Sequence, residues 1–326
     1  MKAIVQDRYG SADVLELREI DKPVVRPGEV LVRVKAAGVD PGVWHLMTGL
    51  PYLVRVMGYG FRAPKDRVRG RALAGTVEAV GADVTDIQPG DDVFGTCEGA
   101  FADYASARAD RIARKPANLT FEQAATVPIS AHTALQGLRD TGQLRPGQSV
   151  LIIGAAGGVG AFAVQLAKAL GAHVTGVCST SKVDLVRSIG ADEVIDYTRD
   201  DFASGARRYD LILDTAGNRP LSYLRRALTP QGTLVLVGGE GGGPWLGMLG
   251  RFFKTYMLAR FVRQRLRVLS STEDKKDLEI LRDLIEAGKV TPVIDRTYAL
   301  RDVPGAIRYL EEGHARGKVV ITVGAQ

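Results

Sequence analysis

The chain has 326 residues, of which 45% are hydrophobic and 25% charged, a composition that excludes disordered and fibrous proteins and suggests about two globular domains. Its net charge is +6, and its two cysteines, Cys97 and Cys178, are too few for a disulfide framework or a cysteine-built zinc site. No apolar run approaches the ~20 residues of a membrane helix, and the N-terminus lacks the apolar core of a signal peptide. We therefore expect a cytoplasmic protein.

The N-terminal part of the chain, up to about residue 120, has the pattern of short strands joined by turns. Apolar and polar residues alternate over 30–36, a second strand is predicted over 74–81, and a turn at 89–91 leads into a third. Residues 40–70 have no clear period. We expect this stretch to be a long surface excursion, of the kind that often carries function.

The pattern then changes to short apolar strands that alternate with helices, which is typical of βαβ units and a parallel sheet. An amphipathic helix and a strand–helix–strand pattern follow towards the end. Residues 181–184 resemble a capping box with Asp in place of Glu. The predicted strands cover 149–153, 173–177, 193–197, 209–213, 233–237 and 318–323, and the predicted helices cover 158–170, 182–189 and 278–287.

A glycine-rich loop, Gly154-Ala155-Ala156-Gly157-Gly158-Val159-Gly160, lies between a predicted strand and a predicted helix. A dinucleotide site needs glycines here because the turn is tight and the backbone approaches the pyrophosphate, which the amides at the helix start then bind. In the G-x-G-x-x-G frame, alanine replaces the first glycine. We assign Ala156, Gly157, Gly158 and Val159 to the cofactor site, the alternative being a tight turn with only a packing role.

An NAD site would place an acidic residue ~20 positions after this loop, at the end of the second strand. The chain has Cys178-Ser179-Thr180-Ser181-Lys182 there, with hydroxyls and a lysine that could bind a 2′-phosphate. The pattern favours NADP and points to Ser179 and Lys182. The alternative is that a serine only caps the next helix and Lys182 is solvated, while Cys178 is interpreted as a buried thiol rather than a nucleophile.

The chain resembles the medium-chain dehydrogenase/reductase superfamily, specifically its zinc-free quinone oxidoreductase-like branch. The resemblance covers nearly the whole chain. It implies an α/β fold, in which a Rossmann domain with a doubly wound parallel sheet (125–271) is inserted into a mainly β, GroES-like catalytic domain (1–124 and 272–326). The motifs that carry it, in order, include Ala37-Gly38-Val39-Asp40-Pro41, Gly75-Thr76-Val77-Glu78-Ala79-Val80-Gly81, Gly154–Gly160, Asp214-Thr215-Ala216-Gly217 and Gly317-Lys318-Val319-Val320.

Zinc-dependent relatives carry a cysteine in the turn where this chain has Asp40, and a histidine after the glycine where it has Arg71. The four histidines stand at no metal-ligand spacing, so the sequence predicts no metal site. Without a Lewis acid, reduction of an already polarised acceptor is easier than alcohol oxidation. The resemblance therefore implies hydride transfer from NADPH to a quinone or an α,β-unsaturated carbonyl compound.

Two residues are candidates for the proton that follows the hydride. The resemblance places His45 where many zinc-free relatives have a tyrosine or another polar residue facing the nicotinamide, and an imidazole can donate a proton near neutral pH. Asp40 could orient His45 or hold a water. The alternatives are a surface histidine, a turn aspartate and direct proton supply by solvent.

Further cofactor contacts follow from the resemblance, one residue at a time. Thr133 matches a residue near the nicotinamide, whereas Lys182 and Tyr197 match residues that hold the 2′-phosphate. Strand-end residues should line the adenosine and the nicotinamide, and two residues near the last strand follow the family pattern. These remaining residues are Ala216, Val237, Gly238, Arg316 and Lys318.

The excess positive charge is concentrated in one segment, since residues 241–272 contain six basic and no acidic residues, interleaved with aromatics such as Trp245 and Phe253. The resemblance implies a mobile loop or helix beside the active site, followed by an edge strand at 264–269 that pairs two subunits into a homodimer. Membrane-surface binding and nucleic-acid binding are the alternatives, and we expect neither.

Two other functions remain open at this point. One is an alcohol or aldehyde reductase of the same fold, which the missing zinc argues against. The other is a low-turnover, NADPH-binding protein associated with membranes. The sequence does not name the substrate, since 40–70 and 240–262, which the resemblance makes the pocket, are its least patterned parts.

Overall fold

The computed structural model describes residues 1–238 and 249–324, and its contacts divide the chain into two compact units. Unit 1 consists of Met1–His132, Glu273–Gly288 and Pro292–Gln326. Unit 2 consists of Thr133–Thr272 and Lys289–Thr291. Trp245, a residue of the predicted basic segment, lies outside the described residues. Within the described part, no helix is long and apolar enough to cross a membrane.

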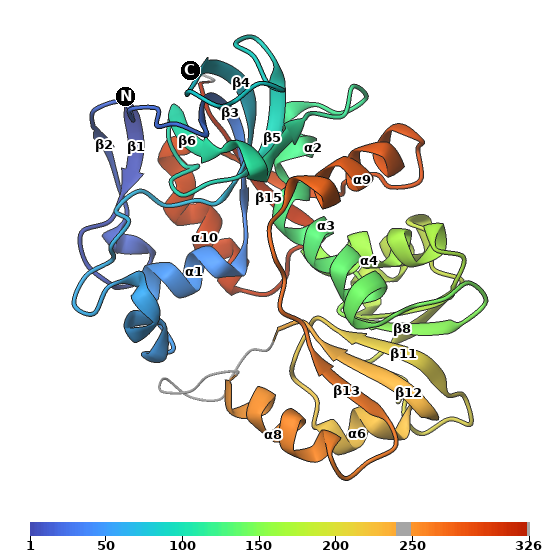
Figure 1. Cartoon of the computed structure of the whole chain (residues 1–326). Helices are drawn as coiled ribbons and strands as arrows, with labels where there is room; N and C mark the ends of the chain where they lie inside the picture. The colour runs from blue at the N-terminus through green and yellow to red at the C-terminus, as the bar shows by residue number, and fades with distance from the viewer. Residues whose placement is uncertain (239–248, 325–326) are drawn as a thin grey trace. The chain divides into compact units, whose positions relative to one another are not determined.

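Unit 1 is built on a mainly antiparallel sheet of seven strands, in the order β14-β15-β3-β4-β5-β7, with β6 also paired to β3 (Figure 1). Its core contains alternate residues of these strands, such as Val32 and Ile321. A separate hairpin joins β1 and β2. The strands are β1 (Lys2–Val5), β2 (Glu16–Glu19), β3 (Glu29–Val39), β4 (Ala72–Val80), β5 (Asp92–Thr96), β6 (Tyr104–Arg108), β7 (Ile112–Arg114), β14 (Ile294–Ala299) and β15 (Lys318–Thr322).

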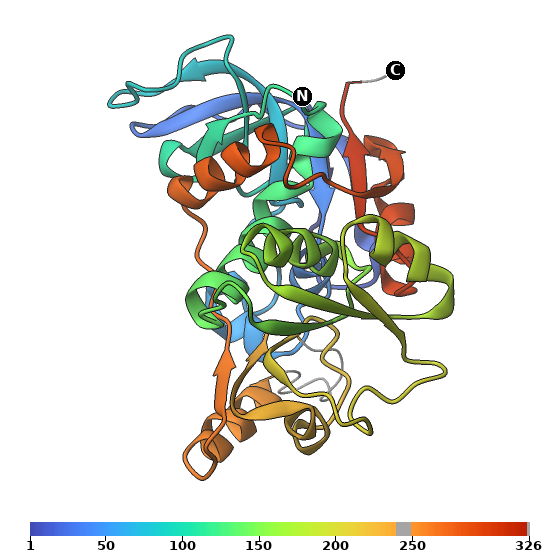
Figure 2. The ribbon, with the colours of Figure 1, turned by 90° about the vertical axis from the view of Figure 1, so that its right-hand side faces the viewer.

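Three helices, α1, α3 and α9, carry residues of the sites described below. α9 packs against β7 (Figure 2), and its N-cap, Asp274, accepts a hydrogen bond from the Asp277 amide. The helical segments of this part of the chain are α1 (Pro41–Thr48), α2 (Phe121–Ala125), α3 (Val127–Gln136), α9 (Lys275–Glu286), α10 (Val303–Glu311), a π-helical stretch at Arg55–Tyr59, and short 3₁₀ turns at Ala12–Val14, Ala109–Arg111 and Leu300–Asp302.

The stretch 40–70, expected as a surface excursion, contains helix α1. Pro41 is its first residue, Val43 and Met47 are buried one turn apart, and Gly49 ends it in the left-handed conformation at φ 62°. The helix is too short to show a period in sequence. The prediction was wrong for these residues, while several apolar side chains between Tyr52 and Phe61 are indeed exposed.

Unit 2 is a parallel sheet of six strands in the order β10-β9-β8-β11-β12-β13, which is the doubly wound Rossmann order. α4 packs against β8 and β9, while α6 and α8 pack against β12 and β13 (Figure 1). The elements are β8 (Ser149–Ile153), α4 (Gly158–Ala169), β9 (His173–Cys178), η5 (Thr180–Lys182), α5 (Val183–Ser188), β10 (Glu193–Asp196), β11 (Tyr209–Asp214), α6 (Leu221–Arg226), β12 (Leu228–Leu236), α8 (Leu249–Ala259), β13 (Arg265–Val268) and a π-helical turn at Gly137–Thr141.

The predicted α/β class, with a Rossmann sheet and a separate, mainly β part, is confirmed. The predicted capping box at 181–184 is wrong, because a 3₁₀ turn begins at Thr180 and precedes α5. Neither Ser179, the N-cap of this turn, nor Lys182, the N-cap of α5, makes a side-chain capping hydrogen bond. The serines at the end of β9 therefore do not cap the following helix.

Candidate functional site

The glycine-rich loop follows β8, at the point in the sheet where the strand order reverses and where open α/β sheets bind ligands. Gly154 adopts φ +82°, which a residue with a side chain rarely tolerates. A Cβ on Gly160 would lie 2.0 Å from the Gly154 carbonyl oxygen. These two positions therefore require glycine for the tight turn and for the close packing of α4 on the loop.

The start of α4 offers backbone donors to an anion. Its N-cap, Gly157, has no side chain to accept hydrogen bonds from the first turn. The amides of Gly158 and Val159 therefore have no acceptor within the helix, and the helix dipole adds partial positive charge there. Ala156 is buried, and a Cβ at Gly157 would meet only the Gly154 oxygen among the described residues, at 3.3 Å. The loop fits the pyrophosphate of a nicotinamide dinucleotide.

The end of β9 carries the residues expected to bind a 2′-phosphate. Ser179 leads into the 3₁₀ turn, and the Lys182 amide donates to its carbonyl oxygen over 2.9 Å. Tyr197 comes directly after β10, the strand next to β9, and is 49% exposed. The sheet therefore brings Ser179, Lys182 and Tyr197 to the same end of two neighbouring strands.

A carboxylate that the sequence analysis missed, Asp196, also ends β10 at this place. It accepts hydrogen bonds from the Thr180 hydroxyl at 2.5 Å and from the amide and hydroxyl of Thr198 at 3.0 and 2.7 Å. These bonds, that from Thr180 first, hold the pKa of Asp196 below its ordinary value. The parallel pairing of β10 with β9 brings Asp196 to this place. The sequence did not reveal Asp196 as a site residue, because it lies far from the glycine-rich loop along the chain.

The ends of β11 and β12 carry the next group of predicted residues. Asp214 is fully buried, and its carboxylate accepts from the Gly217 amide at 2.9 Å and from the Arg251 guanidinium at 2.7 Å. This pair fixes the turn that contains Ala216. Val237 donates its amide to the Asp214 carbonyl oxygen at 3.0 Å, and a Cβ at Gly238 would meet no atom of the described residues within 4 Å.

Cys178 lies at the end of β9 and is buried, as the sequence predicted. Burial, with a smaller contribution from the Asp196 carboxylate, raises the pKa of its thiol to about 11. The thiol is protonated at neutral pH, so it is a poor nucleophile.

In unit 1, a buried ion pair joins two of the predicted site residues, Asp40 and Lys318. Antiparallel pairing of β15 with β3 brings Lys318 next to Val39 and Asp40, and both charged side chains are only 4% exposed. The Lys318 ammonium contacts Asp40 Oδ1 and donates to the Val39 carbonyl oxygen at 3.1 Å and to Ser130 Oγ at 3.0 Å. The Ser130 hydroxyl in turn donates to Asp40 Oδ1 at 3.1 Å.

The hydrogen bonds of this group show which atoms of Lys318 and Asp40 are already engaged. All three protons of the ammonium point to acceptors within unit 1, as a buried charge requires. Asp40 Oδ2 is buried and has no hydrogen-bond partner among the described residues. Asp40 thus keeps one oxygen that could accept a proton or a water. Ser130, which sequence reasoning missed, closes the group from α3.

His45 lies on α1 and is half-buried, with its ring edge-to-face against Trp44. Its Nδ1 lies 2.8 Å from the Leu50 carbonyl oxygen, so Nδ1 carries a proton and, in a neutral ring, Nε2 carries the lone pair. The described residues show no hydrogen bond between His45 and Asp40.

The two remaining predicted residues lie on different elements. Thr133 is the first residue of unit 2, on α3. Arg316 is an exposed residue of unit 1 just before β15, and its amide donates to Asp295 at 3.1 Å.

Two family models match the chain. The "Alcohol dehydrogenase GroES-like domain" covers residues 26–117 and the "Zinc-binding dehydrogenase" model covers residues 189–321. The mitochondrial NAD(P)H oxidoreductase RTN4IP1 of Mus musculus is 34% identical, over 99% of this chain and 89% of the relative. The chloroplastic NADPH-dependent alkenal/one oxidoreductase of Arabidopsis thaliana is 33% identical, over 98% and 79%.

Solved structures agree with these matches. The quinone oxidoreductase from Coxiella burnetii has a TM-score of 0.86 and 29% identity, with 99% of both chains covered. A mycobacterial protein complexed with NADPH has a TM-score of 0.84 and 28% identity, also with 99% of both chains covered. Together with the Rossmann strand order and the glycine-rich loop, these matches show that the chain belongs to the medium-chain dehydrogenase/reductase superfamily, in its zinc-free, quinone oxidoreductase-like branch.

Proposed function

We propose that the protein reduces quinones or α,β-unsaturated carbonyl compounds with NADPH, without a catalytic metal. The observation that carries this proposal is the pairing of Asp40 with Lys318. Zinc-dependent relatives have a metal-binding cysteine at the position of Asp40. In this chain, the Asp40 carboxylate instead pairs with the buried ammonium of Lys318. The names of relatives support the substrate class, since they include a quinone oxidoreductase and an alkenal/one oxidoreductase.

NADPH, when bound, supplies the hydride. The loop at the start of α4 holds the pyrophosphate through backbone amides, and Thr133, Ala216, Val237 and Gly238 are proposed to line the rest of the cofactor. Hydride addition to the β-carbon of an enone leaves negative charge on the carbonyl oxygen, and a proton must then be added. Because Nδ1 of His45 is bound to Leu50, His45 donates from Nε2 only when the ring is doubly protonated.

The cofactor is proposed to be NADPH rather than NADH. Ser179, Lys182 and Tyr197 lie at the ends of two neighbouring strands, where the 2′-phosphate is expected, with Arg316 as a further proposed contact. The nearby Asp196 carboxylate accepts three hydrogen bonds from Thr180 and Thr198, so most of its roughly four acceptor positions are engaged within the chain. It also ends β10 rather than β9, the strand at whose end an NAD site places its acidic residue.

The reaction is tested by following NADPH oxidation with three acceptors: a small quinone, an alkenal and the corresponding saturated aldehyde. We expect turnover with the first two and none with the third. Turnover with the saturated aldehyde would favour the alcohol or aldehyde reductase. Tight NADPH binding without turnover on any acceptor of a broad panel would favour a low-turnover binding protein.

The cofactor preference is tested with Lys182→Ala. A charge-assisted hydrogen bond contributes about 1.5–3 kcal/mol, so KM for NADPH should rise about tenfold or more. KM for NADH should change little, since it lacks the phosphate. Lys168→Ala is the matched control, because Lys168 is a partly exposed lysine of the same unit that pairs with Asp192. Equal weakening of both cofactors, or a parent enzyme that prefers NADH, would contradict the assignment.

A homodimer is proposed through β13. This strand lies at the edge of the six-stranded sheet, with β12 on one side and no strand of the described residues on the other. A free edge exposes backbone donors and acceptors that a second copy can pair. The basic segment beside it is not a uniform cationic surface, since Arg251 is held by the buried Asp214 and α8 exposes Phe253, Tyr256 and Met257.

A further inference from the structure

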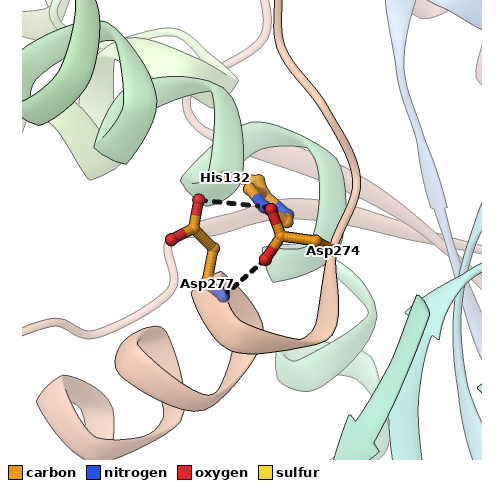
Figure 3. Close-up of side chains that lie close together, drawn as sticks. All are labelled: His132, Asp274 and Asp277. Carbon is orange, nitrogen blue, oxygen red and sulfur yellow. Dashed lines mark hydrogen bonds and ion pairs between the residues drawn. The ribbon is translucent and has the colours of Figure 1, made fainter. Parts of the chain in front are cut away.

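Three side chains from two helices of unit 1 converge at one place outside the proposed active site (Figure 3). His132 comes from α3, and Asp274 and Asp277 come from the N-cap and first turn of α9. Their nearest nitrogen and oxygen atoms all lie within 4.8 Å of one another. All strands of the Rossmann sheet, β8 to β13, lie between these two helices along the chain. The spacing of residues in the sequence therefore did not predict this cluster.

His132 is the unusual member of the cluster. It is 98% buried, since its exposed fraction is 2%, and neither ring nitrogen has a hydrogen-bond partner among the described residues. A buried polar nitrogen without a partner costs about 1–3 kcal/mol. Nε2 faces the two carboxylates, at 3.3 Å from Asp277 Oδ2 and 3.9 Å from Asp274 Oδ2. The ring is thus buried with Nε2 directed at two carboxylate oxygens.

Both carboxylates are held in place by the start of α9. Asp274 Oδ1 accepts from the Asp277 amide at 2.9 Å, which leaves Oδ2 to face His132. The neighbouring Glu273 is not part of the cluster, since it is engaged by Arg71 at 2.8 Å and by Thr96 at 2.9 Å. Asp277 is nearly buried, at 6% side-chain exposure, whereas Asp274 is 45% exposed. The cluster therefore has one open side, towards solvent at Asp274.

We propose that His132, Asp274 and Asp277 bind one divalent transition-metal ion, with Zn²⁺ as the best fit. Neighbouring ligands of a tetrahedral zinc with bonds of about 2.0–2.1 Å lie about 3.3–3.4 Å apart. The separation of His132 from Asp277 already matches this value. Asp274 would have to move closer, since its oxygen lies 3.9 Å from His132 and the three ligand atoms lie within 4.8 Å of one another. A water reaching the ion past Asp274 would complete four ligands.

The donor set indicates the kind of ion. An imidazole nitrogen is a poor ligand for Mg²⁺ and Ca²⁺, which take oxygen, and a good one for zinc and its neighbours. The sequence predicted no metal site because the histidines have no metal-ligand spacing along the chain. The fold brings two carboxylates that are distant in sequence next to His132. The ion would be structural, since it joins α3 to α9 where the chain leaves unit 1 at His132 and returns at Glu273.

The test is metal content and stability, because the proposed reaction needs no metal. Protein freed of metal with a chelator is mixed with a slight excess of Zn²⁺, desalted and analysed by mass spectrometry. We expect about one zinc per chain and a rise in Tm of about 5–10 °C, as expected for a ligand at about a hundredfold its Kd. Co²⁺ in its place should give the strong visible absorption of a tetrahedral site.

Asp274→Ser is the decisive variant, since serine is as good an N-cap as aspartate and keeps α9 intact. It should bind less than a tenth of the zinc and lose the Tm rise. Asp283→Ser, at an exposed aspartate of the same helix, is the matched control and should behave as the parent. The proposal is overturned if the parent binds no zinc, or if Asp274→Ser binds as much as the parent.

Discussion

Lys318→Met should destabilise unit 1 strongly. The substitution keeps most of the side-chain volume but removes the ammonium. The buried Asp40 carboxylate then keeps Ser130 as its only side-chain partner in the described part of the chain. Removing one member of a buried ion pair costs about 3–5 kcal/mol. With a urea dependence of about 2 kcal/mol per molar, the unfolding midpoint should fall by about 1.5 M or more.

Tryptophan fluorescence reports this unfolding, because one of the two tryptophans, Trp44, lies on α1 and packs against the core of unit 1. Asp40→Asn combined with Lys318→Met removes both charges and should recover about 2 kcal/mol of the loss. Lys22→Met is the control. Its exposed pair with Glu78 should contribute less than about 1 kcal/mol.

The same variant separates a structural lysine from a cofactor-binding one. An unchanged urea midpoint together with a raised KM for NADPH would refute the ion-pair reasoning and assign Lys318 to the cofactor. A lowered midpoint with an unchanged KM would show that Lys318 acts by holding Asp40.

The remaining predictions concern the proton, the thiol and the assembly. His45→Phe should lower kcat with an enone about 100-fold, because phenylalanine has no proton to donate; an unchanged kcat would show that solvent supplies the proton. In a Cys97→Ala background, the alkylation rate of Cys178 should rise about tenfold per pH unit up to about pH 10, because burial raises the pKa of the thiol. The rate for a free thiol of pKa ~8.5 levels off at lower pH. A rate that levels off near pH 9 would contradict the raised pKa. Sedimentation at micromolar concentration should give twice the mass of one chain, and a monomer would exclude pairing through β13.

The sequence predicted those parts of the fold that local patterns encode. Alternating apolar residues marked a strand of the N-terminal part, and short apolar runs marked the strands of the parallel sheet. Glycines between β8 and α4 marked the phosphate loop, because a tight turn and a close helix leave no room for a side chain at Gly154 and Gly160. α1 was missed because a helix with two buried residues has no measurable period. The predicted capping box at 181–184 was wrong because a 3₁₀ turn at Thr180–Lys182 precedes α5, so Ser181 does not stand at the N-cap of the helix.

The tertiary structure alone brought together the charged groups. Lys318 meets Asp40 through the pairing of β15 with β3, Arg251 leaves the basic segment to pair with Asp214, and His132 meets Asp274 across two helices. The residues next to each of these side chains in the sequence form no pattern that predicts its partner. Which charges become paired depends on burial, since an isolated buried charge costs several kcal/mol, and burial is a property of how distant segments pack rather than of neighbouring residues.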